Sequence, residues 1–163
     1  MGDLVVIVLE DEAEVRDAIV RDLATFLGSV RIDEADTADD AEAALRDAVQ
    51  HGDHVGLVLA DHRLPGRDGV DLLVALHHDP ATAAIRKVLL TGQADHQDTI
   101  RAINDAGLDW YIAKPWQLEE LQAVVVRQLT DFVVDVGLDP LPYVSELDGP
   151  RLMDAYARRG PTD

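Results

Sequence analysis

The sequence has no cysteine among its 163 residues, which excludes a disulfide framework and any zinc site built on thiolates. Positive charge is also scarce, because 14 Lys and Arg residues face 32 Asp and Glu residues, for a formal net charge of −18. Such a charge repels nucleic acid and anionic membranes and favours cations as ligands. The apolar run at residues 4–9 is too short for a signal peptide or a membrane span. We therefore expect a cytoplasmic protein that binds neither nucleic acid nor a membrane directly.

Short apolar runs rich in Val, Ile and Leu alternate with longer amphipathic segments along most of the chain. The expected strands are residues 4–9, 30–35, 55–60, 87–91 and 110–113, and the expected helices are residues 12–27, 38–50, 70–78, 95–106 and a segment from 117 onward. The first and third strands are apolar on both faces, which is typical of parallel strands covered by helices on each side. The pattern predicts an α/β fold with a doubly wound parallel sheet of five strands.

Polar side chains that carry chemistry follow the predicted strands: Glu10 and Asp11 the first, Asp61 the third, Thr91 the fourth and Lys114 the fifth. In a doubly wound sheet, ligands bind beyond the carboxyl ends of the strands. If the strand order is 2-1-3-4-5, the first and third strands are neighbours, and the three carboxylates share one small volume. Crowded carboxylates require a cation, and oxygen ligands without cysteine favour Mg²⁺, or Mn²⁺, over zinc. The hydroxyl and the ammonium group would serve a phosphoryl group on Asp61.

Four longer segments contain these side chains: VLEDE from residue 8, LADHRLPGRDG from residue 59, LLTGQAD from residue 89 and WYIAKPW from residue 110. Together they resemble the receiver domain of bacterial two-component response regulators, over residues 4 to about 129. The resemblance implies a flavodoxin-like sheet of order 2-1-3-4-5. It also implies an aspartate that is phosphorylated by a histidine kinase or a histidine phosphotransfer protein. Phosphorylation would switch a face that contacts a downstream protein target, and catalysis would be limited to the domain's own phosphoryl transfer and autodephosphorylation.

The resemblance gives a role to each matched residue near the predicted metal site. Asp61 corresponds to the phosphoacceptor, Asp11 to a direct Mg²⁺ ligand, and Glu10 to an acidic partner that acts directly or through metal-bound water. The backbone carbonyl of Arg63 corresponds to a further ligand. The side chains of Arg63 and Gln93 lie beside the acceptor and the switch residue in the matched pattern, and we expect them to tune dephosphorylation.

A second group of matched residues is implied in the response to phosphorylation. Thr91 resembles the switch hydroxyl that swings onto the phosphoryl group, Lys114 resembles its counter-ion, and Tyr111 resembles the aromatic residue that changes rotamer with the switch. The resemblance also implies that the Lys114–Pro115 bond is cis. Gly92 matches a position that is kept small, which leaves the phosphoryl group accessible.

Other interpretations of the same residues stay open. Taken alone, Asp61 is typical of a turn or a helix cap, and only the matched strand ends together favour a site. A phosphatase of the haloacid dehalogenase type also uses an Asp nucleophile with Mg²⁺, but it needs a second Asp where this chain has Arg63. A nucleotide-binding module would need a glycine-rich phosphate loop after the first strand, and the sequence lacks one there. A degenerate receiver that serves only as an interaction scaffold, and the N-terminal receiver of a longer regulator, are the remaining alternatives.

The last predicted helix carries an apolar stripe beyond the point where the sheet can cover it, through Leu129, Phe132, Val133 and Val136. We expect a receiver domain at residues 1–129 and, at residues 130–163, an extended last helix and a short tail without an independent output domain. A contiguous exposed apolar stripe is uncommon on a monomer. We expect a second copy of the chain to cover it in a homodimer, with a folded-back tail as the competing outcome.

Overall fold

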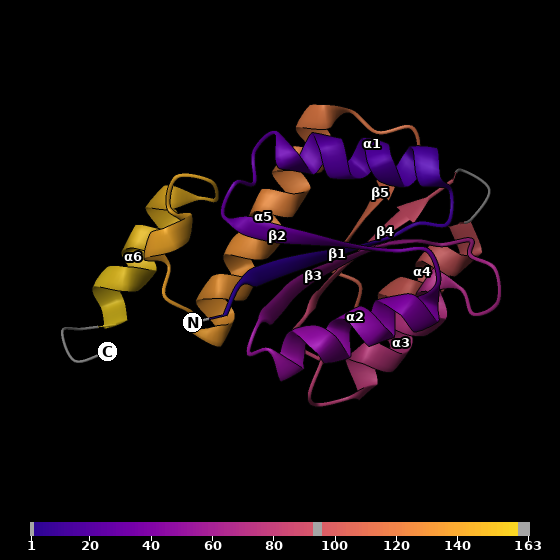
Figure 1. Ribbon diagram of the computed structural model, residues 1–163, viewed down its shortest axis with the longest axis horizontal. Helices are drawn as coiled ribbons and strands as arrows, with labels where there is room; N and C mark the ends of the chain where they lie inside the picture. Colours follow the sequence, from indigo (N-terminus) through magenta and orange to yellow (C-terminus); the bar gives the residue numbers. More distant parts are fainter. Residues whose placement is uncertain (1, 93–95, 160–163) are drawn as a thin grey trace.

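The computed structural model describes residues 2–92 and 96–159. Within these residues the sheet has five parallel strands in the order β2-β1-β3-β4-β5 (Figure 1). The strands are β1 Leu4–Leu9, β2 Val30–Ala35, β3 His54–Asp61, β4 Arg86–Thr91 and β5 Trp110–Ala113. The predicted fold class and strand order are confirmed, and β3 is longer than predicted by one residue at each end.

Helices cover both faces of the sheet, as Figure 1 shows. One face carries α1 (Ala13–Ala24) and α5 (Leu118–Val136), and the other carries α2 (Ala38–Gln50), α3 (Gly69–His78) and α4 (His96–Asp105). Helix α1 stops three residues earlier than predicted, but Leu27 still packs into the core from the following loop. No helix within residues 2–92 and 96–159 is both long enough and apolar enough to cross a bilayer.

Strand β1 lies inside the sheet, between β2 and β3, and all of its side chains are buried. Successive side chains point to opposite faces, so that Val6 enters the core beneath α1 and α5, whereas Ile7 enters the core beneath α2, α3 and α4. A slip of one residue would exchange the two sets, and burial on both faces therefore specifies the register. Because the register of β1 is specified, the positions of the polar residues that follow this strand are specified as well.

The chain after α5 folds back against that helix. Gly137, with a φ of 75°, ends α5, and a short 3₁₀ helix, η1 (Leu141–Tyr143), and α6 (Gly149–Arg159) follow. Figure 1 shows η1 and α6 together at one end of the molecule, beside α5. This segment contributes three buried side chains to the core that contains Leu129, Phe132 and Val133; they are Tyr143, Leu147 and Leu152.

The expectation that the α5 stripe lies exposed is wrong, because the tail already covers most of it. The homodimer contact through α5 stays a prediction without this support. Among the stripe residues, Val136 is the exposed one. Two hydrogen bonds at the surface hold the tail in place: the Glu146 carboxylate accepts from the backbone N–H groups of Gly28 and Ser29 at 2.6 and 2.8 Å. The competing expectation, a folded-back tail, is the arrangement found.

Candidate functional site

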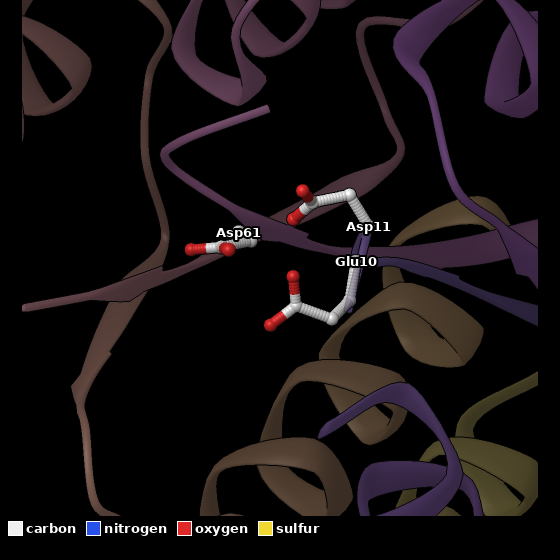
Figure 2. Close-up of side chains that lie close together, drawn as sticks. All are labelled: Glu10, Asp11 and Asp61. Carbon is white, nitrogen blue, oxygen red and sulfur yellow. The ribbon is translucent and has the colours of Figure 1, made fainter. Parts of the chain in front are cut away.

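Three carboxylates meet at the carboxyl edge of the sheet and are called here the carboxylate cluster. Asp61 ends β3, and Glu10 and Asp11 come directly after β1, the neighbouring strand. One oxygen of each side chain lies within 4.8 Å of the other two (Figure 2). Glu10 and Asp61 are buried, whereas Asp11 is exposed. The structure thus brings the three predicted acidic residues together, and their oxygens are the hard donors that Mg²⁺ prefers.

The loop after β3 positions the Asp61 backbone. The Gly69 N–H donates to the carbonyl oxygen of His62 at 3.1 Å, so that α3 begins directly beside the end of β3. A Cβ atom at residue 69 would lie 2.0 Å from the Asp61 carbonyl oxygen, and only glycine permits this approach. The Asp68 side chain caps α3 by accepting from the Asp71 N–H at 2.8 Å. These contacts explain why Asp68 and Gly69 stand at the start of α3.

Lys114 faces two of these carboxylates from the loop after β5. Its Nζ atom lies 3.0 Å from Asp61 Oδ1 and 3.2 Å from Glu10 Oε1. Its backbone N–H donates to the carbonyl oxygen of Thr91 at 2.9 Å, which joins this loop to the end of β4. The Lys114–Pro115 peptide bond is cis, as the resemblance implies. One ammonium group therefore bridges the ends of β1 and β3.

Burial and crowding change the acid–base properties of the carboxylate cluster. Burial chiefly, together with the hydrogen bond and charge of Asp61, raises the pKa of Glu10 from 4.5 to about 7, although Lys114 opposes the shift. Burial lowers the pKa of Lys114, but the carboxylates of Asp61 and Glu10 outweigh it and raise that pKa overall. One ammonium group does not neutralise three carboxylates, so a divalent cation would relieve the remaining repulsion.

We expect the stability of the metal-free protein to fall as the pH rises through the pKa of Glu10. A raised pKa in the folded state means that the contribution of this group is full below about 4.5 and is lost as the pH rises toward about 7. Glu10→Gln has no such proton to lose and should be more stable than the wild type above neutral pH, by about 1–2 kcal/mol. Urea unfolding in EDTA at an acidic and an alkaline pH measures the difference. The same pH slope in both proteins would contradict the role given to Glu10.

Thr91 and Tyr111 lie in different surroundings. Thr91 is the last residue of β4 and is buried, whereas Tyr111 lies in β5 and is 49% exposed. The Thr91 Oγ1 atom lies 3.1 Å from the carbonyl oxygen of Gly92 and 3.3 Å from Thr99 Oγ1 in α4. Tyr111 lines a surface cavity of about 710 Å³ between α4, β5 and α5. The structure therefore places the first side chain inside the fold and the second on the surface formed by these three elements.

The remaining predicted residues flank the carboxylate cluster in the chain. Arg63 is exposed in the loop that follows Asp61, and Gly92 is half-buried directly after β4. Gln93 lies outside the described residues.

Two residues near the site were missed by the sequence analysis. Arg16, in α1, donates from Nη1 to the carbonyl oxygen of Glu10 at 2.8 Å and so supports the backbone of the carboxylate cluster. Nothing in its spacing distinguishes Arg16 from an ordinary surface charge. Thr99, which contacts Thr91, does have a signal: it shares an inner helix face with Ala102, one turn later. A polar residue on such a face indicates a buried contact.

Comparisons with known proteins agree with this geometry. A family model for the response regulator receiver domain matches residues 6–126. The chain is 29% identical to the phosphate regulon transcriptional regulatory protein PhoB of Pseudomonas aeruginosa, over 97% of the chain and 68% of PhoB. It is 35% identical to the transcriptional regulatory protein AruR of the same species, over 94% of the chain and 61% of AruR. The crystal structure of the receiver domain of NtrX from Brucella abortus, 27% identical, matches with a TM-score of 0.66 over 76% of this chain and 97% of that one.

The match to the family model contains the carboxyl end of every strand, the whole carboxylate cluster and Lys114. The chain spans only 61% of the length of AruR and 68% of that of PhoB, so these comparisons concern the domain rather than the activity of either whole relative. Sequence, fold and site lead to one family: the chain belongs to the response regulator receiver domains.

Proposed function

We propose that this chain is a Mg²⁺-dependent phosphoacceptor of a two-component system, with Asp61 as the acceptor. The observation that carries the proposal is the placement of Asp61, 3.0 Å from the Lys114 ammonium and within 4.8 Å of oxygens from Glu10 and Asp11. A nucleophile, a counter-ion and a set of metal ligands are the parts that an acyl-phosphate site needs. The membership of the receiver family supports the same reaction.

In the proposed reaction, an oxygen of Asp61 attacks the phosphorus of a phosphohistidine on a histidine kinase or a histidine phosphotransfer protein. The new O–P bond forms as the N–P bond breaks, and the imidazole nitrogen keeps the electron pair of that bond. Lys114 pairs with one phosphoryl oxygen, and the Thr91 hydroxyl donates to another. A cation held by the carboxylate cluster and the backbone carbonyl of Arg63 would neutralise charge on the phosphoryl oxygens. The domain later hydrolyses its own acyl phosphate.

The response to phosphorylation is proposed to reach the surface formed by α4, β5 and α5. Tyr111 changes rotamer when Thr91 moves, and its exposure beside a surface cavity supports a role in contacting a downstream protein target. Arg63, Gly92 and Gln93 set the access of water to the phosphoryl group and thereby the lifetime of the signal.

The net charge and the range of the family match support proposals for the partners, the location and the boundaries of the domain. A net charge of −18 argues for protein partners in the cytoplasm rather than direct contact with nucleic acid or a membrane. We assign residues 1–129 to the receiver and residues 130–163 to the extended helix and tail, since the family match ends within α5 at residue 126. A scaffold that is never phosphorylated, and a place at the start of a longer regulator, are the competing proposals.

Phosphorylation by acetyl phosphate tests the proposal. With Mg²⁺, the wild-type protein is expected to gain a single phosphoryl group by intact-mass spectrometry, and in EDTA it is expected to gain none. A folded protein that gains no phosphoryl group under either condition would refute the proposal and support the scaffold instead.

We expect Asp11→Ala to weaken Mg²⁺ binding by about tenfold or more, because a direct ligand contributes at least as much as the groups that orient it. The carboxylate of Asp11 is exposed, so its removal leaves the core intact. Titration of Mg²⁺ against Trp116 fluorescence measures the affinity, and His51→Ala, in the loop after α2, is the control. Equal affinities in the two variants would show that Asp11 does not hold the ion.

A further inference from the structure

The Thr91 hydroxyl has a defined partner on α4 in this structure. Its Oγ1 atom lies 3.3 Å from Thr99 Oγ1, and the two residues are 5% and 6% exposed. The Thr91 backbone is held on the β5 side, because it pairs with Ala113 and its carbonyl accepts from the Lys114 N–H at 2.9 Å. Rotation about χ1, which has few accessible rotamers in threonine, is the motion left to the hydroxyl.

A hydroxyl that turns toward a phosphoryl group on Asp61 leaves its partner on α4. The contact with Thr99 therefore stabilises the unphosphorylated rotamer and opposes the phosphorylated one. Both hydroxyls are buried, where an unmade hydrogen bond is costly, so the contact has more weight here than at the surface. The coupling between the Thr91–Thr99 contact and phosphorylation of Asp61 is reciprocal. Any change that weakens the contact therefore favours the phosphorylated state.

Among the residues that the structure describes, the inner face of α4 continues from Thr99 with small apolar side chains. Ala102 and Ala106 follow Thr99 at helical spacing and are fully buried, but each offers only a methyl group. On the flank of this face, Ile100 and Ile103 are 45% and 48% exposed. The hydroxyl contact is thus a directional link between the end of β4 and a helix that presents apolar side chains to solvent.

We propose that Thr99 is a positioning residue that holds the Thr91 hydroxyl in its unphosphorylated orientation and so couples α4 to the state of Asp61. The inference rests on the proposed function and adds to it a residue on α4 that sets the balance between the two states. Helix α4 then loses a contact when Asp61 is phosphorylated.

The test is the affinity for beryllofluoride, a phosphoryl mimic, in the presence of Mg²⁺. Thr99→Val keeps the shape of the side chain and removes its hydroxyl, and it should bind beryllofluoride about two- to tenfold more tightly than the wild type. Thr99→Ser keeps the hydroxyl and should bind as the wild type does. Thr25→Val, at the exposed end of α1, is the control for loss of a threonine hydroxyl elsewhere. Circular dichroism verifies that each variant is folded.

A double-mutant cycle separates this role from a general effect on packing. In a Thr91→Val background the contact no longer exists, so adding Thr99→Val should leave the affinity for beryllofluoride unchanged. An equal gain in both backgrounds, or no gain in the single variant, would overturn the inference while leaving Asp61 as the acceptor. If the wild type binds no beryllofluoride with Mg²⁺, the proposed function itself is wrong, and the role of Thr99 is excluded with it.

Discussion

Asp61→Asn is expected to gain no phosphoryl group from acetyl phosphate under conditions that modify the wild-type protein. The amide oxygen is a poor nucleophile, and the amide can neither form the acyl phosphate nor carry the charge that a divalent ion needs. The substitution changes few contacts, since asparagine has the shape of aspartate and its carbonyl still accepts a hydrogen bond from Lys114, 3.0 Å away in the wild type. The loss should be complete in intact-mass spectra, while the fold persists.

Asp47→Asn is the matched control for this experiment. Asp47 lies exposed on α2, outside the carboxylate cluster, and the variant should be phosphorylated to the same extent as the wild type. Modification of Asp61→Asn at the wild-type level would show that another residue accepts the phosphoryl group. Modification of the wild type in EDTA would show that the carboxylate cluster does not act through a metal.

Removal of residues 138–163 is expected to lower the free energy of unfolding by about 4 kcal/mol or more. Burial of a large apolar side chain contributes about 1.5–3 kcal/mol, and the tail contributes Tyr143, Leu147 and Leu152 to one core. Small domains have only about 5–15 kcal/mol in total, so the loss is severe. The shortened protein would also expose Phe132 and Val133 and should self-associate. Urea unfolding and sedimentation measure the two effects.

Two neighbouring residues of α6 provide a matched test within the full chain. Leu152 is fully buried, whereas Met153 is 43% exposed. Leu152→Ala should cost about 2–5 kcal/mol, as a buried leucine typically does, and Met153→Ala should stay within about 0.5 kcal/mol of the wild type. Similar urea midpoints for the two variants would mean that the tail does not pack in solution as described.

The fold was predictable chiefly because the interior strands carry apolar runs that few other structures share. Residues 4–9 are apolar without a break, and a strand with helices on both sides accounts for this run. The carboxylate cluster was predictable for a related reason. Parallel strands end at one edge of the sheet, so Glu10 and Asp61 meet once the strand order is known.

The position of the tail was not predictable, because a stripe of apolar residues shows that a helix needs cover but not what covers it. The bond between Glu146 and the Gly28 N–H joins residues 118 positions apart, and no local spacing indicates it. Arg16 was missed for a similar reason, since its partner is a backbone carbonyl, which has no sequence signature. Such contacts depend on how the helices, strands and loops pack against one another in the tertiary structure.

The two cores draw on different lengths of the chain, and this affects how the protein folds during synthesis. The core beneath α2, α3 and α4 uses residues from Val5 to Ala106, whereas the core beneath α1 and α5 extends from Leu4 to Leu152 (Figure 1). Ribosomes add only about 5–20 residues per second, so the first core is complete in sequence seconds before the second. Until Leu152 emerges, β1 is covered on one face and partly bare on the other. During that interval the nascent chain exposes apolar side chains of the second core, which chaperones can bind.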